Sequence, residues 1–256
     1  MRKTLLITGA TAGFGRAIAR RFAGNGYDVI ITGRRQGRLE ELKAELEGLY
    51  SCKAYVSRFD IRNKEEVVTA IAAIKKEVGN IDTLVNNAGL ASGLSSIDEG
   101  DTDDWDVMID TNVKGLLYVT RQVVPMMKEQ GYGHIINIGS TAGKVAYKNG
   151  NVYCATKFAV DALNQSMRID LLPFGIKVTG INPGMAETEF SMVRFKGDEE
   201  RARKVYEDIT PLKAEDIADV VYYCATLPPH VCINDLTMTC TSQANSIYTI
   251  RDSEKR

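Results

Sequence analysis

The chain has 256 residues, of which 25% are charged and 44% hydrophobic, and its formal net charge at pH 7 is −1. These proportions are ordinary for a globular protein, so they exclude disorder for the bulk of the chain and predict one domain. With 32 basic and 33 acidic residues, no net field favours nucleic acid or an anionic membrane surface, which indicates a small-molecule partner.

Membrane, secretion and metal-site signals are missing from the sequence. No apolar run approaches the roughly 18 residues of a membrane helix. The apolar residues near the start are followed at once by Thr8 and Gly9, too early for a signal peptide. The five cysteines form no CxxC pair and the two histidines lie far apart, so we predict no metal site. We expect a cytoplasmic protein.

Short β-branched apolar runs alternate with longer helical patterns along the whole chain. The predicted strands cover residues 3–8, 28–32, 54–56, 82–86, 134–139, 177–181 and 231–238. The predicted helices cover residues 15–23, 36–48, 64–78, 103–130, 152–172 and 214–227. This alternation predicts an α/β fold, a single-domain, Rossmann-like, doubly wound seven-stranded parallel sheet flanked by helices, over residues 1–256.

Three segments depart from that alternation. Residues 90–104 form a Gly/Ser/Asp-rich loop after the fourth strand, and residues 185–210 form a long excursion after the sixth. Ligands of open α/β sheets bind beyond the carboxyl ends of the strands, so residues 185–210 are a candidate substrate lid, or alternatively a surface excursion or subunit contact. We expect the tail, residues 241–256, to fray or to dock on a neighbouring subunit.

A glycine-rich turn, residues 8–15, joins the first predicted strand to the first helix. Gly9 suits the tight turn, Gly13 lets the backbone approach a pyrophosphate, and Gly15 allows close helix packing. The free N–H groups and partial positive charge of the helix N-terminus favour phosphate. Since no Lys-Ser/Thr pair follows, this is not a P-loop. The turn therefore predicts dinucleotide binding.

The end of the second strand predicts which dinucleotide binds. An NAD site usually has an acidic residue there for the ribose 2′-hydroxyl, whereas this chain has Gly33 followed by Arg34 and Arg35. Two guanidinium groups suit a 2′-phosphate, so we predict NADP(H). The alternative is that both arginines merely begin a solvated helix.

Tyr153 and Lys157 lie four residues apart near the start of a predicted helix, and so share one face. An ammonium beside a phenol favours phenolate, which makes the pair an acid/base unit. Ser140 ends the fifth strand, where its hydroxyl can hold a carbonyl oxygen. Asn112 lies inside a predicted helix, where asparagine is locally unfavourable and so suggests a function.

Taken together, these motifs resemble a short-chain dehydrogenase/reductase over residues 3 to about 240. The resemblance rests on residues 8–15, Asp60, residues 86–89, Asn112, Ser140, Tyr153 with Lys157, and Pro183-Gly184. More narrowly, residues 9–15, 108–112, 135–143 and 187–198 are similar to the NADP-dependent serine and 3-hydroxy acid dehydrogenases. Sulfoacetaldehyde reductases resemble that branch too.

The resemblance implies a role for each matching residue. Tyr153 exchanges a proton with the substrate oxygen, Ser140 hydrogen-bonds that oxygen, Lys157 holds the nicotinamide ribose and lowers the pKa of Tyr153, and Asn112 retains a water. The implied cofactor-binding residues are Gly9, Ala10, Thr11, Ala12, Gly13, Phe14, Gly15, Arg34, Arg35, Asp60, Ile61, Asn86, Ala88, Gly89, Tyr153, Lys157, Pro183, Gly184, Met185, Ala186 and Thr188. The resemblance also implies a homotetramer.

The substrate end of the site is predicted from two residues. Arg194, within the candidate lid, can hold a carboxylate or sulfonate through two hydrogen bonds, and Tyr147 lies between Ser140 and Tyr153 in the sequence. The alternatives are an exposed helix charge and ordinary packing. We therefore expect an NADP-dependent oxidoreductase acting on a short, anionic 3-hydroxy acid. The alternatives are a sulfoacetaldehyde reductase, another carbonyl reductase, or a non-catalytic NADPH-binding sensor.

Overall fold

The strands form one parallel sheet in a computed structural model that describes residues 2–255. Their order is β3-β2-β1-β4-β5-β6-β7. The strands are β1 (Thr4–Ile7), β2 (Asp28–Gly33), β3 (Ala54–Arg58), β4 (Thr83–Asn86), β5 (Gly133–Ile138), β6 (Ile176–Pro183) and β7 (Asp235–Met238). The order reverses direction between β1 and β4, which creates a crevice at the carboxyl edge. The predicted fold is confirmed.

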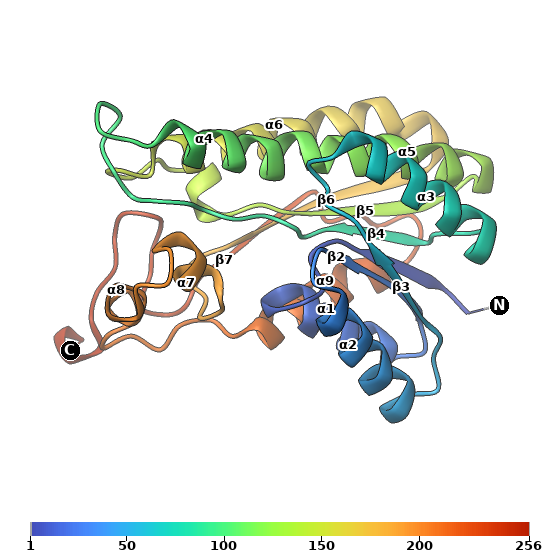
Figure 1. Ribbon diagram of the computed structural model, residues 1–256, viewed down its shortest axis with the longest axis horizontal. Coiled ribbons are helices and arrows are strands. Elements are labelled where there is room, and N and C mark those ends of the chain that lie inside the picture. The colour runs from blue at the N-terminus through green and yellow to red at the C-terminus, as the bar shows by residue number, and fades with distance from the viewer. Residues whose placement is uncertain (1, 256) are drawn as a thin grey trace.

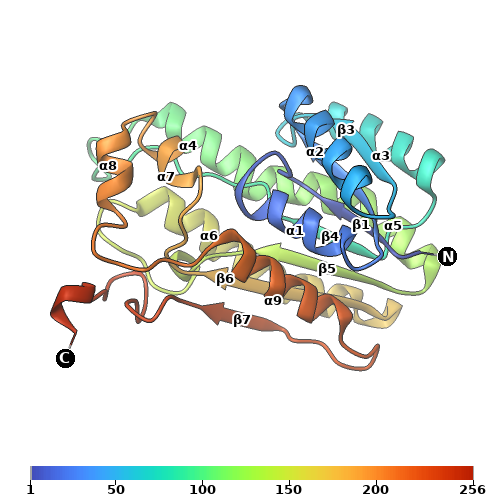
Figure 2. The ribbon, with the colours of Figure 1, turned by 90° about the horizontal axis from the view of Figure 1, so that it is seen from below.

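Helices cover both faces of this sheet (Figure 1). On one side lie α3 (Lys64–Val78), α4 (Thr102–Ile109), α5 (Leu116–Gln130) and α6 (Asn151–Leu171). On the other lie α1 (Gly13–Ala23), α2 (Gln36–Leu49) and α9 (Ala214–Thr226). The predicted lid contains two short helices, α7 (Phe190–Arg194) and α8 (Glu199–Lys204). Both lie beyond the carboxyl ends of the strands (Figure 2).

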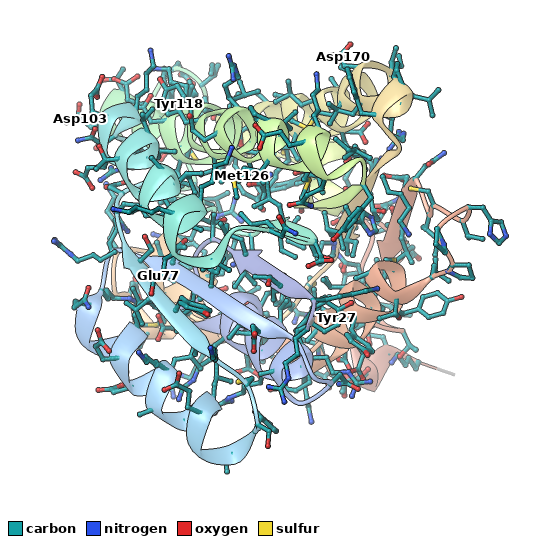
Figure 3. The ribbon with its side chains drawn as sticks, turned by 90° about the vertical axis from the view of Figure 1, so that its right-hand side faces the viewer. Tyr27, Glu77, Asp103, Tyr118, Met126 and Asp170 are labelled. Atoms are coloured by element: carbon teal, nitrogen blue, oxygen red, sulfur yellow. The ribbon has the colours of Figure 1, made fainter. Side chains whose placement is uncertain are left out.

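Each face of the sheet has its own apolar core. Successive strand residues point to opposite faces, so Leu5 and Ile7 of β1 pack with α1, α2 and α9, whereas Leu6 packs with α3, α5 and α6. Tyr27, which follows α1, and Met126 of α5 mark the two cores in Figure 3. Burial on both faces explains why the strand sequences are continuously apolar.

The helix predicted at residues 103–130 is three segments, because a π-helical stretch, Asp110–Gly115, separates α4 from α5. A π-helical turn widens the helix, and such turns are frequent at functional sites. The wider turn carries Asn112, whose amide nitrogen donates to the backbone oxygen of Leu90 at 2.8 Å. The mid-helix asparagine is thus accommodated by a local change of helix type.

The last strand is shorter than the predicted residues 231–238, since β7 begins only at Asp235. Side chains satisfy part of the backbone before it: Lys177 Nζ donates to the oxygen of Val231 at 3.2 Å, and Arg168 Nη1 to that of Asn234 at 2.8 Å. The amide of Gly180 in β6 also donates to the oxygen of Asn234, at 3.0 Å. The regular ladder with β6 therefore begins at Asp235.

The tail packs on its own chain over the residues described, rather than fraying as one alternative expected; docking on a neighbouring subunit stays a prediction. The amide of Asp252 donates to the oxygen of Asp208 at 2.8 Å, and its carboxylate accepts from Ser242 Oγ at 2.8 Å. The tail thereby fastens the end of the predicted lid. Among residues 2–255, no helix is long and apolar enough to cross a membrane.

Candidate active site

A cavity of about 540 Å³ lies at the carboxyl edge of the sheet. Its walls come from the β1–α1 turn, the ends of β2, β4, β5 and β6, the start of α6, the lid and the tail. The lid and the C-terminal segment lie together at this end of the molecule (Figure 2). This is the position at which open parallel sheets bind ligands, so the cavity is the candidate active site.

The glycine turn forms the floor at one end. Gly9 and Gly13 have φ values of +69° and +49°, a region that side-chain-bearing residues rarely adopt. The first helix has no side-chain cap at Ala12, which leaves its terminal N–H groups available for an anion. Asn87 Nδ2 holds the turn by donating to the backbone oxygen of Thr8 at 2.8 Å.

Three arginines gather where a 2′-phosphate is predicted. Arg35 donates through Nε and Nη2 to Thr11 Oγ1, at 3.0 and 2.7 Å. Its Nη1 donates to Glu189 at 3.0 Å, and Arg38 Nη1 donates to the same carboxylate at 2.7 Å. Arg34 lies 3.8 Å from a carboxylate oxygen of Asp60. Glu189 and Arg38 were missed from sequence because they lie far apart in the chain.

Tyr153 and Lys157 lie buried at the centre of the cavity wall, with 8% and 7% of their surface exposed. Lys157 Nζ donates to the backbone oxygen of Ile138 at 2.9 Å and lies 5.9 Å from the centre of the Tyr153 ring. Burial lowers the pKa of Lys157 to about 8. Desolvation makes the ammonium costlier, so this lysine titrates far below an exposed one.

The acid/base properties of Tyr153 differ from the sequence prediction. Burial raises the pKa of its phenol above the ordinary value, and the nearby Tyr147 raises it further. A hydrogen bond from Ser140 and the charge of Arg194 lower it, but less than burial raises it. We expected Lys157 to lower the pKa of Tyr153. Desolvation of the phenolate instead raises that pKa by more than the neighbouring charges lower it. Burial thus favours the protonated phenol of Tyr153.

Asn112 lies behind Lys157 rather than in the cavity wall. Its Oδ1 accepts from the amide of Leu90 at 2.9 Å, and its Nδ2 donates to Thr156 Oγ1 at 3.0 Å. A Cβ placed on Gly89 would lie 3.2 Å from Asn112 Oδ1 and 3.6 Å from Lys157 Nζ. Asn112 therefore fixes the loop that passes directly over the lysine.

Lid residues cover the reactive hydroxyl. The guanidinium carbon of Arg194 lies 5.4 Å from the ring centres of both Tyr147 and Tyr153, and Arg194 Nη2 donates to the Tyr147 hydroxyl. The buried Nε of Arg194 has no hydrogen-bond partner among the described residues. Phe190 packs on Tyr153 with ring centres 5.6 Å apart. The lid thus brings one cation to the substrate end of the site.

Most predicted site residues line the cavity, and four do not: Ala10, Gly15, Asn86 and Asn112. Ala10 is fully buried in the core. Asn86 Nδ2 donates to Thr120 and Asn137, each at 2.9 Å, so its side chain crosslinks the core. Ala10 and Asn86 therefore lie behind the cavity wall, and the cofactor contacts predicted for them stay predictions.

Several wall residues carried no recognisable sequence signal. Asn87, Phe190, Gln243, Ser246 and Thr249 all line the cavity. Gln243 Oε1 accepts from the amide of Met185 at 2.7 Å, so the tail fixes the start of the lid. Asn87 and Phe190 lie within residues 86–89 and 187–198, which carry the family resemblance, but neither was singled out as a site residue.

Comparisons with known proteins agree with this geometry. A family model described as short chain dehydrogenase matches residues 3–199. The chain is 49% identical over 241 residues to the NADP-dependent 3-hydroxy acid dehydrogenase YdfG of Escherichia coli strain K12, covering 94% of this chain and 96% of that protein. It is 45% identical over 251 residues to sulfoacetaldehyde reductase 2 of Chromohalobacter salexigens, covering 98% and 99%.

A solved structure gives the same result. The closed form of serine dehydrogenase complexed with NADP+ superposes with a TM-score of 0.91 at 48% identity, covering 95% of this chain and 97% of that one. The family match spans most of the sheet, the glycine turn and the Ser140-Tyr153-Lys157 group. The chain therefore belongs to the short chain dehydrogenase family.

Proposed function

We propose that this chain is an NADP(H)-dependent oxidoreductase that interconverts a short 3-hydroxy acid and its semialdehyde or 3-keto form. The substrate class is that of L-serine, L-allo-threonine and 3-hydroxypropionate. The observation that carries the proposal is the position of the Arg194 guanidinium, 5.4 Å from the Tyr153 ring. An anion clamp beside a proton donor suits a substrate that carries a carboxylate near its reacting carbon.

The cavity fits a dinucleotide phosphorylated on the adenosine ribose. Its glycine turn has the positive φ values of a phosphate cradle, and a Cβ on Gly13 would lie 3.3 Å from Thr188 Cβ, so a side chain there would crowd the cavity between the turn and Thr188. Arg34 and Arg35 would hold the 2′-phosphate, Asp60 the adenine, and Lys157 the nicotinamide ribose. The YdfG relative, named NADP-dependent, supports this choice of cofactor.

The chemistry needs one hydride and one proton. When bound, NADP(H) supplies or accepts the hydride at the carbinol carbon. In reduction the carbonyl electron pair moves onto oxygen, which takes the Tyr153 proton while Ser140 donates a hydrogen bond to it. In oxidation Tyr153 takes that proton back. Burial favours the neutral phenol, the form that donates a proton in reduction, whereas oxidation starts from the phenolate.

A second candidate, a sulfoacetaldehyde reductase, is favoured by a specific observation. A guanidinium donates hydrogen bonds to a sulfonate as readily as to a carboxylate. A protein 45% identical to this chain is named sulfoacetaldehyde reductase 2. A carbonyl reductase without preference for anions is a third possibility. A non-catalytic NADPH sensor would have no need of Ser140, Tyr153 and Lys157 in one cavity.

The test is turnover by the purified protein with a panel of substrates. The panel contains L-serine, L-allo-threonine, 3-hydroxypropionate, 3-hydroxyisobutyrate and sulfoacetaldehyde, each in the direction it permits and with both NADP(H) and NAD(H). We expect the highest kcat/KM with a 3-hydroxy acid and NADP+. A higher kcat/KM with sulfoacetaldehyde and NADPH would favour the second candidate. Equal kcat/KM for the two cofactors would contradict NADP(H) selectivity, and no turnover at all would favour the sensor.

The proposal includes a homotetramer in the cytoplasm. Leu117 of α5 and Phe158 and Ile169 of α6 are large apolar side chains with 37%, 42% and 74% of their surface exposed, and a subunit contact would cover them. The five cysteines are free thiols, which fits a reducing compartment. Light scattering after gel filtration will give the mass in solution, and a monomer mass would contradict the tetramer.

A further inference from the structure

The lid is fastened near its start to the cofactor end of the cavity. Glu189 is the N-cap of α7 and Arg35 is the N-cap of α2. The 3.0 Å ion pair between them joins two segments that are 154 residues apart in the sequence. Phe190 and Arg194, which lie close to the Tyr153 ring, belong to the helix that this pair anchors. The lid is therefore attached to Arg35, one of the two arginines predicted to hold the 2′-phosphate.

The guanidinium of Arg35 already donates hydrogen bonds to Thr11 and Glu189. A guanidinium has five N–H donors and binds an oxyanion best through two parallel donors on one edge. Nε and Nη2 point to Thr11, and Nη1 points to Glu189. One N–H on Nη1 and one on Nη2 remain, so a 2′-phosphate that binds through this edge shares Nη1 with Glu189. Glu189 is the partner that a dianion also repels, because the two are like charges on one cation.

Glu189 has a second ion-pair partner, Arg38, which is not predicted to bind the phosphate. Arg38 Nη1 donates to its other carboxylate oxygen at 2.7 Å, and Arg38 does not line the cavity. Release from Arg35 would therefore loosen the lid without freeing it. Both arginines and Glu189 have 45% to 48% of their side-chain surface exposed, so each ion pair contributes about 1 kcal/mol or less.

We propose that Glu189 is a positioning residue that shares Arg35 between the lid and the 2′-phosphate of the cofactor, so that each weakens the attachment of the other. This inference rests on the proposed NADP(H) specificity. Binding of the 2′-phosphate moves Glu189 onto Arg38 alone, which raises the mobility of α7. By thermodynamic reciprocity, an attached lid lowers the affinity for the 2′-phosphate by the same factor.

The direct test measures binding of two nucleotides that lack nicotinamide. Adenosine 2′,5′-bisphosphate carries the 2′-phosphate and adenosine 5′-monophosphate does not. By titration calorimetry we expect Glu189→Gln to bind the bisphosphate about three- to fivefold more tightly than the wild type, and the monophosphate equally. The matched control is Glu187→Gln, the same charge change on an exposed lid residue outside the cavity wall, which should leave both affinities unchanged.

Backbone hydrogen exchange in residues 190–195 measures the mobility of the lid directly. In the wild type the bisphosphate should speed exchange there, and in Arg38→Ala it should do so more strongly because Arg35 is then the remaining partner of Glu189. In Glu189→Gln exchange should be fast and independent of the ligand. Unchanged or weaker bisphosphate binding by Glu189→Gln, or slower lid exchange on binding in the wild type, would overturn the inference.

The binding measurements distinguish failure of the proposed cofactor specificity from failure of the inference about Glu189. If the wild type binds the bisphosphate no more tightly than the monophosphate, the NADP(H) assignment fails and the inference falls with it. If the wild type prefers the bisphosphate but Glu189→Gln binds it equally, only the inference falls. Thermal melts of all variants establish that they are folded, which is expected for these exposed side chains.

Discussion

The ammonium nitrogen of Lys157 lies 5.9 Å from the centre of the Tyr153 ring, one turn along the same helix. It is held there by the carbonyl of Ile138 rather than by the phenol. Both side chains are almost fully buried, so each is displaced toward its neutral form: the pKa of Lys157 falls to about 8 and that of Tyr153 rises. Burial thus opposes charge on both members of the pair.

Tyr153→Phe removes the proton donor and keeps the ring. We expect kcat for carbonyl reduction to fall at least about 100-fold, the usual contribution of a positioned acid, whereas the Kd for NADPH stays within about twofold. Steady-state kinetics and fluorescence titration of NADPH will measure the two quantities. A variant that keeps most of its kcat would exclude Tyr153 from proton transfer.

Lys157→Met tests burial of the lysine through the pH dependence of stability. The unfolded chain holds the lysine proton up to about pH 10.5, but the folded chain only up to about pH 8. Between these values the unfolded state binds more protons, so wild-type stability rises with pH. The free energy of unfolding of the variant, relative to wild type, should be highest below pH 8 and fall toward pH 10.5.

Urea unfolding at pH 7, 8, 9 and 10 will measure that difference. The exposed Lys148→Met serves as the comparison for loss of a surface charge. A constant difference between Lys157→Met and wild type from pH 8 to 10 would show that the buried lysine keeps an ordinary affinity for its proton. Leaving the Ile138 carbonyl unpaired lowers the free energy of unfolding of the variant by the same amount at every pH, so it does not affect how the difference varies with pH.

Arg194→Ala tests the anion clamp. We expect KM for a 3-hydroxy acid to rise about tenfold or more, as for loss of hydrogen bonds to a charged group, and KM for a neutral ketone to change little. Arg203→Ala, on the exposed side of α8, is the matched control and should leave both constants unchanged. An equal effect of Arg194→Ala on acid and ketone would refute the clamp.

Gly15→Ala tests the packing of the first helix against the glycine turn. The added Cβ would overlap the backbone oxygen of Gly9 and lie 2.7 Å from Asn87 Nδ2, so the turn has to move. We expect a lower Tm and at least about tenfold weaker NADPH binding. Gly37→Ala in α2 meets nothing within 4 Å and should be neutral or stabilising by about 0.5–1 kcal/mol.

The sequence was most informative where a function depends on local geometry. The glycine turn needs positive φ at Gly9 and Gly13, and the Tyr153 and Lys157 pair needs a spacing of one helical turn; both requirements leave a residue pattern. The π-helical turn at Asp110–Gly115 left a weaker signal, the unfavourable Asn112 inside a helix pattern.

Contacts between distant segments left no such pattern. Gln243 of the tail reaches Met185 in the lid, and Glu189 reaches Arg35 across 154 residues. These pairs follow from the order in which the strands assemble, not from any spacing along the chain. Periodicity reports which face of an element is apolar, but it does not report which element packs against that face.

By itself, then, the sequence determined the α/β alternation, the glycine turn and the spacing of Tyr153 and Lys157, because each depends on backbone conformation or spacing within a few residues. The tertiary structure alone decided that the pKa of Tyr153 is raised, since that depends first on desolvation by burial and then on the nearby Tyr147. It also decided that the predicted lid is fastened at Arg35 and Arg38, because only folding brings Glu189 next to them.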